Sequence, residues 1–214
     1  MKLYGYWRSS AAYRCRIALN LKGVRPEFVP IHLRRGDQRA QEFLRLNPQG
    51  RVPALDIGGG GQVLTQSLAI IEWLEETRPD PPLLPRDPVG RAHVRAFALA
   101  IAADIHPLNN LAILKYLKNP LGHDQATIDA WYRHWVEGGL KACEALVLKD
   151  GRRGPFCFGA TPTLADVCLV PQLANARRVD SDLSACPTLL EIEAHCARLP
   201  AFADAAPERQ PDAE

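Results

Sequence analysis

The chain has 214 residues, of which 47% are hydrophobic and 23% charged; this is the composition of a soluble globular protein and excludes a disordered or collagen-like chain. Its 26 basic and 24 acidic residues leave a net charge of only +2, so we expect no sequence-independent binding to nucleic acid. We identify no run of about 18 apolar residues that would cross a membrane. The N-terminus lacks the apolar centre of a signal peptide, so we expect a cytoplasmic protein.

The first part of the chain alternates between strand-like and helix-like segments. Short apolar or alternating runs predict strands, and apolar residues at helical spacing predict helices. In chain order we expect a strand at 2–6, a helix at 10–22, a strand at 27–32, a short helix at 41–46, strands at 54–57 and 62–64, and a helix at 66–77. The first β-α-β unit predicts two parallel strands. The glycines at 58–61 lack the lysine of a phosphate-binding loop and are interpreted as a hairpin turn.

Five prolines lie within residues 78–88, where they prevent a continuous helix or a central strand. We therefore predict a first domain at 1–80, a proline-rich linker at 81–88 and a second domain at 89–214. The second domain is predicted to be helical, with a stretch at 89–118 that bends around His106-Pro107 and helices at 125–148, 163–179 and 187–199. Thr163 and Asp166 are interpreted as a helix cap without a chemical role. The tail from Ala205 is expected to cross back over the surface or to fray.

The six cysteines are scattered and include no C-x-x-C pair. This spacing argues against a zinc site and against a redox dithiol, and we predict no metal site. In a cytoplasmic protein, we expect most of these cysteines to be small buried hydrophobic residues.

Two serines, Ser9 and Ser10, stand where the first strand ends and the first helix begins. A helix N-terminus presents unpaired N–H groups and a partial positive charge, which favour an anion. A serine hydroxyl at this place can cap the helix or donate a hydrogen bond to a bound thiolate, and the residues alone leave both interpretations open. Arg8 precedes the serines, and its planar guanidinium is suited to carboxylates.

Two further segments have features of a peptide-binding site. Pro53 opens a predicted strand, which is typical of a cis peptide bond; the backbone of Val52 could then pair with an extended peptide. A simple turn proline is the alternative. Gln66 and Ser67 open the next helix, where we expect Ser67 to be the cap and the first N–H groups to favour a carboxylate. A thiol-bearing peptide with a carboxylate would use all of these features.

The motifs occur in an ordered set that resembles zeta-class glutathione transferases, the class of maleylacetoacetate and maleylpyruvate isomerases. The resemblance covers nearly the whole chain. It rests on Arg8-Ser9-Ser10, Asn47-Pro48 with Val52-Pro53, the segment that begins at Gln66-Ser67, residues 104–110 and 163–172, Asn175 to Arg178, and Gln210-Pro211-Asp212.

The resemblance implies an α/β thioredoxin-like N-terminal domain, an all-α helical C-terminal domain, a homodimer and glutathione as the cofactor. It implies catalytic roles for Ser9 and Ser10 at the glutathione sulfur, and for Arg8 and Arg178 at the carboxylates of a dicarboxylate keto acid. It also implies that glutathione is bound by Ser9, Ser10, Gln38, Val52, Pro53, Gln66, Ser67, His106 and Asn110.

The implied activity is the cis–trans isomerisation of a maleyl keto acid, maleylacetoacetate or maleylpyruvate, to its fumaryl isomer. The glutathione thiolate would add to the double bond, the bond would rotate, and the thiolate would leave. The class usually has a cysteine after the paired serines, whereas this chain has Ala11; the reaction needs no protein nucleophile. There are three alternatives: a transferase that conjugates or dehalogenates small α-halo acids, a glutaredoxin-like oxidoreductase, and a non-catalytic module. The missing cysteine argues against the oxidoreductase.

Overall fold

The computed structural model describes residues 1–58, 61–152 and 154–214. The chain forms two compact units, one of residues 1–83 with 198–214 and the other of residues 84–197. The division predicted from the sequence placed residues 198–214 with the helical part. In the structure they cluster with the first unit instead, because they run along its first helix.

The first unit contains, within its described residues, a four-stranded sheet with the order β2-β1-β3-β4. Its strands are β1 (Lys2–Gly5), β2 (Glu27–Pro30), β3 (Ala54–Asp56) and β4 (Val63–Thr65). β1 and β2 are parallel, as the β-α-β order predicts, and β3 is antiparallel to both β1 and β4. The hairpin is therefore confirmed, although residues 59–60 of its predicted turn lie outside the described residues.

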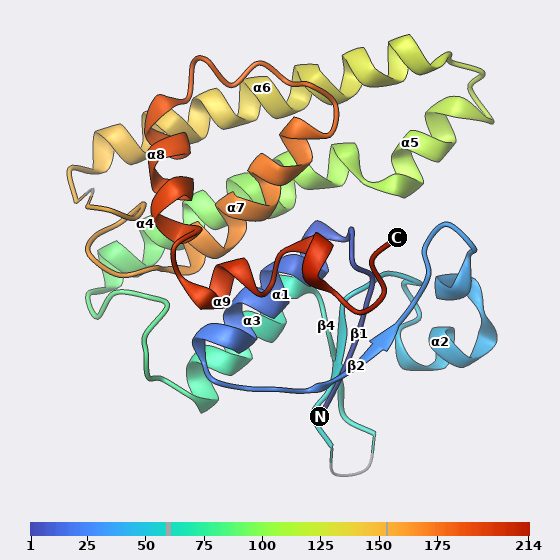
Figure 1. The fold of residues 1–214 in the computed structure, drawn as a ribbon, viewed down its shortest axis with the longest axis horizontal. Helices are drawn as coiled ribbons and strands as arrows, with labels where there is room; N and C mark the ends of the chain where they lie inside the picture. The colour runs from blue at the N-terminus through green and yellow to red at the C-terminus, as the bar shows by residue number, and fades with distance from the viewer. Residues whose placement is uncertain (59–60, 153) are drawn as a thin grey trace. The chain divides into compact units, whose positions relative to one another are not determined.

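Helices α1 (Ser10–Leu21) and α3 (Ser67–Thr77) pack together on one side of this sheet, and α2 (Gln41–Leu46) lies on the other (Figure 1). A 3-10 turn, η1 (Asp37–Arg39), precedes α2. This is the thioredoxin-like arrangement that the resemblance implied. Helix α1 is buried on most of its surface, and its buried residues include Arg14 and Arg16.

A buried ion pair holds the start of the proline-rich segment against the first unit. Lys22 Nζ donates to Glu75 Oε2 at 2.6 Å and to the carbonyl oxygen of Pro81 at 2.6 Å. The same Glu75 oxygen accepts the backbone N–H of Leu83 at 2.9 Å. Prolines leave carbonyl oxygens without neighbouring N–H donors, and the lysine supplies that donor.

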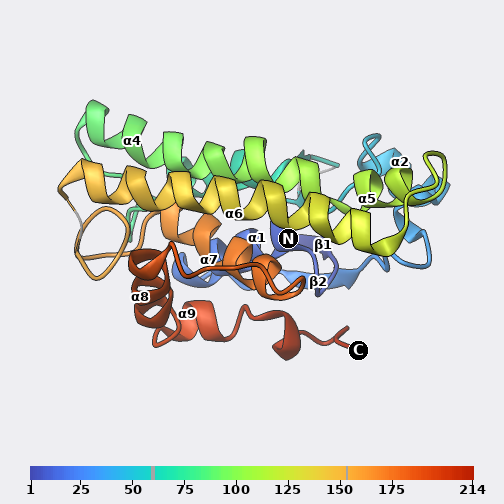
Figure 2. The same ribbon diagram turned by 90° about the horizontal axis from the view of Figure 1, so that it is seen from above.

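The second unit is built from helices among its described residues, as predicted, with one isolated β-bridge between Phe156 and Gly159. Helices α4 and α6 run side by side in Figure 2. The bend predicted around His106-Pro107 is a π-helical turn followed by a 3-10 turn. Gly139 allows the close approach there, because a Cβ at this position would lie 2.4 Å from Ile105 Cδ1. In chain order the elements are α4 (Pro88–Leu99), η2 (Ala100–Ile105), η3 (His106–Asn109), α5 (Leu111–Lys118), α6 (Gln125–Asp150), α7 (Leu164–Arg177) and α8 (Pro187–Cys196).

Residues 88–118 are long and apolar enough, by length and composition alone, to be considered as a membrane span, whereas no such span was predicted from the sequence. Their helical course is interrupted at Asn110, whose backbone is extended. A helix that crosses a bilayer needs continuous backbone hydrogen bonding. Val94, Phe97 and Ile101 are fully buried in the protein, so one face of this stretch contributes to the core of the second unit.

A side-chain carboxylate orders the start of α7, and another orders the end of α6. Thr163 and Asp166 form the predicted capping box at the start of α7, and Asp166 also accepts the N–H of Cys157 at 2.8 Å. At the end of α6, the Asp150 carboxylate accepts hydrogen bonds from Arg152 Nε at 2.6 Å and contacts His93 Nδ1 at 2.5 Å. The hydrogen bond from Arg152 lowers the pKa of Asp150 to about 2.

Candidate active site

Strand register brings three of the predicted site segments to one end of the sheet in the first unit. Tyr4 of β1 pairs with Ala54 of β3, and Ala54 pairs with Thr65 of β4. The residues just after β1, just before β3 and just after β4 therefore emerge together. These segments contain Arg8, Ser9 and Ser10, then Val52 and Pro53, and then Gln66 and Ser67.

Ser9 is the N-cap of α1. Its Oγ accepts the N–H of Ala12 at 3.2 Å, and its own N–H donates to the carbonyl of Tyr6 at 2.9 Å. Capping uses the oxygen of the hydroxyl as an acceptor, so its proton can still be donated to a bound anion. Ser10 is the first helical residue and is only 5% exposed, whereas Ser9 is half-buried. The first turn of α1 contains no acidic residue, so nothing in that turn neutralises the positive end of the helix.

The Val52-Pro53 peptide bond is cis, as predicted. Among the described residues, neither the N–H nor the C=O of Val52 forms a hydrogen bond. The preceding loop is held by Asn47, whose Nδ2 donates to the carbonyl of Arg51 at 2.7 Å and whose Oδ1 accepts the N–H of Gln49 at 3.1 Å. The site therefore presents a backbone donor and acceptor on a loop that is fixed from behind.

The start of α3 differs from the prediction. Ser67 is not the cap but the first helical residue, and Gln66 occupies the cap position with φ of 68°. A positive φ at a residue other than glycine costs about 1–3 kcal/mol and often marks a functional site. The Gln66 side chain donates to Gln49 Oε1 at 3.0 Å. Ser67 is buried, and its Oγ accepts a hydrogen bond from Arg14 Nη1 at 3.1 Å, which leaves the hydroxyl proton for a carboxylate.

Gln38 and Arg8 belong to the same unit. Gln38 lies on η1, and its carbonyl oxygen would be 3.0 Å from a Cβ at Gly50, so it borders the loop that leads to Val52. Its side-chain Nε2 donates to the carbonyl of Leu33 at 3.3 Å. Arg8 is half-buried, and its guanidinium lies 5.5 Å from the centre of the Trp7 ring.

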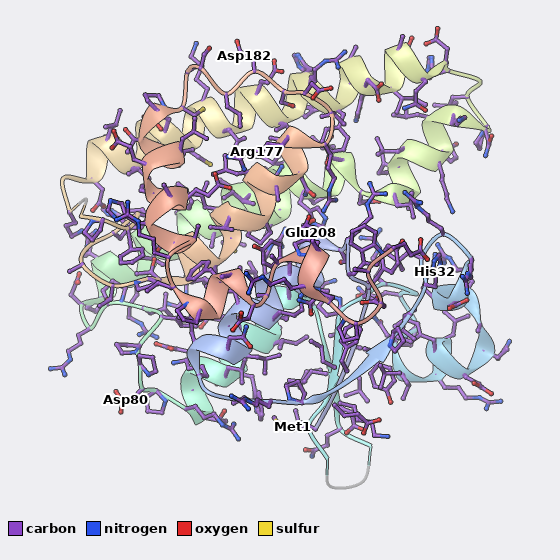
Figure 3. The ribbon with its side chains drawn as sticks, in the orientation of Figure 1. Met1, His32, Asp80, Arg177, Asp182 and Glu208 are labelled. Carbon is purple, nitrogen blue, oxygen red and sulfur yellow. The ribbon has the colours of Figure 1, made fainter. Side chains whose placement is uncertain are left out.

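His106, Asn110 and Arg178 belong to the second unit. His106 begins η3. Asn110 caps α5, since its Oδ1 accepts the N–H of Ala112 at 2.9 Å and its Nδ2 donates to the carbonyl of Pro107 at 2.6 Å. Arg178 is exposed at the end of α7, next to Arg177 (labelled in Figure 3), which pairs with Glu193. The roles of these three residues toward glutathione or substrate stay predictions.

Three charged residues support the site, although no role was predicted for them from the sequence. Arg14 bonds to Ser67, while Arg16 and Asp212 bond to the backbone of Trp7. Arg14 and Arg16 are 2% and 5% exposed. Their signal in the sequence is the presence of arginines in a helix whose other residues are mostly small or apolar, which indicates buried, paired charges.

The groups at this end of the sheet fit a thiol-containing peptide. The start of α1 with Ser9 suits an anion, the Val52 backbone suits an extended peptide, and Ser67 with the first N–H groups of α3 suits a carboxylate. Glutathione has these three parts in one molecule.

Comparisons with known proteins agree with this geometry. Residues 1–76 match the family model for the glutathione S-transferase N-terminal domain, and residues 125–205 match that for the C-terminal domain. Maleylpyruvate isomerase of Ralstonia sp. is 52% identical over 212 residues, which are 99% of each chain.

Two solved structures have the same fold. The holo structure of a maleylpyruvate isomerase, described as a bacterial zeta-class glutathione S-transferase, is 51% identical, with a TM-score of 0.97 and full coverage of both chains. Maleylacetoacetate isomerase of Methylobacterium extorquens AM1, with bound malonate and glutathione, is 42% identical, with a TM-score of 0.96 and full coverage of both chains. The chain therefore belongs to the glutathione S-transferase family, in the zeta class that includes the maleylpyruvate and maleylacetoacetate isomerases.

Proposed function

We propose that this protein is a glutathione-dependent isomerase that converts a maleyl keto acid to its fumaryl isomer. The observation that carries the proposal is the convergence of the α1 start, the unbonded Val52 backbone and the α3 start at one end of the sheet. The names of the relatives support the reaction. When bound, glutathione supplies a thiolate that adds reversibly to the maleyl double bond and so allows rotation about it.

The first task of the protein is to keep that sulfur ionised. A free thiol has a pKa of about 8.5, which falls at helix N-termini. The first turn of α1 provides this field without an acidic residue that would oppose it. The Ser9 hydroxyl caps the helix through its oxygen and donates its proton toward the sulfur.

The second task is to hold a substrate with two carboxylates. We assign this to Arg8 and Arg178, because a guanidinium binds a carboxylate through two parallel hydrogen bonds. The malonate in the Methylobacterium extorquens structure is a dicarboxylate, which supports this class of ligand. Since a charge-assisted hydrogen bond contributes about 1.5–3 kcal/mol, Arg8→Ala and Arg178→Ala should each lower kcat/KM at least tenfold.

Arg177→Ala is the matched control for Arg178→Ala. Arg177 is the neighbouring arginine, and its exposed guanidinium pairs with Glu193; its removal should change kcat/KM less than about twofold. Equal losses in the two variants would refute a specific role for Arg178. Unchanged kinetics in both Arg8→Ala and Arg178→Ala would show that these two arginines do not bind the carboxylates of the substrate.

A side-by-side spectral assay tests the reaction itself. Maleylacetoacetate, maleylpyruvate and a small α-halo acid are supplied separately, with and without glutathione. The proposal predicts turnover of at least one maleyl keto acid, an absolute requirement for glutathione, and no net consumption of glutathione. Faster turnover of the halo acid, with stoichiometric loss of glutathione, would instead establish a conjugating or dehalogenating transferase.

We also propose that the protein acts in the cytoplasm as a homodimer. All six cysteines are buried and none forms a disulfide, which fits a compartment where thiols stay reduced. The dimer is what the resemblance implies. Light scattering after size-exclusion chromatography tests the assembly, for which we expect a mass about twice the 23.7 kDa of one chain. A mass of one chain at working concentration would refute the dimer.

A further inference from the structure

The loop between β1 and α1 carries Arg8 and Ser9, and two charged side chains hold the backbone of Trp7 at its start. The N–H of Trp7 donates to Asp212 Oδ2 at 3.0 Å, and the carbonyl of Trp7 accepts a hydrogen bond from Arg16 Nη2 at 3.1 Å. Trp7 and Asp212 are 205 residues apart in the sequence. Both backbone groups of the residue that precedes Arg8 are therefore fixed from outside the loop.

Arg16 joins the loop to the C-terminal segment. Its Nε donates to the carbonyl of Ala205 at 2.9 Å, so one guanidinium contacts both Trp7 and the tail. The residue is only 5% exposed. Burial lowers the pKa of Arg16 to about 10, while Tyr13 and Asp212 act in the opposite direction. Arg16 thus stays charged at neutral pH, and Asp212 supplies a compensating negative charge nearby.

The C-terminal segment has a defined course along α1 rather than a frayed one. Asn20 near the end of α1 donates to the carbonyl of Ala201 at 3.0 Å, in the short helix α9 (Pro200–Ala203). The segment then passes Arg16 and reaches Trp7 at the start of α1 (Figure 1). Within it, Gln210 Nε2 donates to the carbonyls of Asp204 and Ala206, each at 2.9 Å, around the 3-10 turn η4 (Pro207–Arg209), where Glu208 is labelled in Figure 3.

We propose that Asp212 is a positioning residue of the active site: with Arg16, it holds Trp7 so that the loop presents Arg8 and Ser9 to the glutathione sulfur and the substrate. The inference rests on the proposed function, because it gives the loop its task. Asp212 touches neither glutathione nor substrate in this scheme. Its effect is transmitted through the Trp7 backbone to residues one and two positions further along the chain.

Three variants separate positioning from a general contribution to folding. Asp212→Ala removes the acceptor of the Trp7 N–H, and Asp212→Asn keeps an acceptor oxygen without the charge. Asp204→Ala is the matched control, because Asp204 is an aspartate of the same tail whose carboxylate pairs only with exposed Arg209, at 3.0 Å, among the described residues. Each protein is compared by glutathione titration calorimetry, by steady-state kinetics and by hydrogen exchange of the peptide that contains residues 6–9.

Loss of the hydrogen bond from Trp7 to a carboxylate should raise the exchange rate of the Trp7 amide and the glutathione Kd about tenfold or more in Asp212→Ala. Asp212→Asn should recover most of the affinity, and Asp204→Ala should match the wild type. If Asp212→Ala exposes the Trp7 amide but binds glutathione and turns over substrate like the wild type, the positioning role is wrong. Equal losses in Asp212→Ala and Asp204→Ala would also overturn it.

The same data distinguish a failure of the proposed function. A wild-type protein that does not bind glutathione overturns the proposed function, and the positioning role with it. A wild type that binds glutathione normally, together with an unaffected Asp212→Ala, overturns the positioning role alone. If Asp212→Ala does not fold, Asp212→Asn is used instead, because its neutral oxygen accepts a weaker hydrogen bond than a carboxylate. The Trp7 exchange rate and the glutathione Kd should then rise together, each by less than tenfold. Faster exchange at Trp7 with unchanged glutathione affinity, or wild-type values of both, would refute the inference.

Discussion

Replacement of Ser9 separates its two possible tasks, which are to cap α1 and to donate a hydrogen bond to the glutathione thiolate. The structure shows the first directly, in the 3.2 Å hydrogen bond that Ser9 Oγ accepts from the N–H of Ala12. Loss of a serine N-cap to alanine costs about 0.5–2 kcal/mol of stability, whereas glycine at the same position costs only a few tenths. Ser9→Ala and Ser9→Gly therefore differ in stability but lack the hydroxyl equally.

The catalytic loss should be the same in both variants. A hydrogen bond to a charged group contributes about 1.5–3 kcal/mol, which corresponds to a fall in kcat/KM of roughly 10- to 150-fold. Urea unfolding measures stability, and initial rates at varied glutathione measure catalysis. We expect Ser9→Gly to be nearly as stable as the wild type and as inactive as Ser9→Ala.

The opposite pattern would refute the reasoning. If Ser9→Gly keeps its rate within about twofold of the wild type while Ser9→Ala loses stability, Ser9 is a helix cap and nothing more. Ser10→Ala is the comparison variant, because Ser10 is adjacent but only 5% exposed. A larger catalytic loss in Ser10→Ala than in Ser9→Ala would indicate that Ser10, and not Ser9, donates the hydrogen bond to the thiolate.

Three further predictions concern the scaffold. Lys22→Ala should lower the free energy of unfolding by about 3–5 kcal/mol, because it removes the cation that pairs with the buried carboxylate of Glu75. The exposed pair of Lys2 with Glu27 should contribute under about 1 kcal/mol, so equal losses in Lys22→Ala and Lys2→Ala would contradict this prediction. Asp150→Asn should be less stable than the wild type above about pH 4, where an ordinary aspartate is ionised. Since the pKa of Asp150 is lowered to about 2, the difference in unfolding free energy between the two proteins should shrink as the pH falls toward that value. A difference that does not change with pH would count against the ion pair of Asp150 with Arg152. All six cysteines are buried, and burial raises the pKa of Cys143 to about 12. An aromatic disulfide reagent should therefore label the native protein slowly and react with six thiols only after unfolding. Rapid labelling of the native protein would contradict the burial of the cysteines.

Much of the fold could be predicted because its signals are local. Apolar spacing and the proline-rich segment indicate the order of strands and helices, and the parallel pairing of β1 and β2 follows from their connection through α1. The capping box of Thr163 and Asp166 has its partners three residues apart and was confirmed. The predicted ends of the strands and helices differed by a few residues, since fraying at helix ends leaves little trace in sequence.

The contacts that organise the site could not be predicted in the same way. The hydrogen bonds from Arg14 to Ser67 and from Trp7 to Asp212 join residues 53 and 205 positions apart, and no spacing rule links such residues. Ser67 was predicted to cap α3 because serine is a common cap. That prediction was wrong, because Gln66 takes the cap position with a positive φ, which no residue type announces. The tail was expected to cross the surface or fray, and the buried charge of Arg16 explains why it is ordered.

The most direct test of the central claim is the ionisation of the bound cysteine thiol. Glutathione labelled with carbon-13 at the cysteine Cβ is titrated by NMR, free and in complex with the wild-type protein, at saturating protein concentration. Stabilisation of the thiolate by Ser9 and the start of α1 predicts a pKa clearly below the value of about 8.5 for a free thiol. Bound glutathione that titrates like free glutathione would contradict the account.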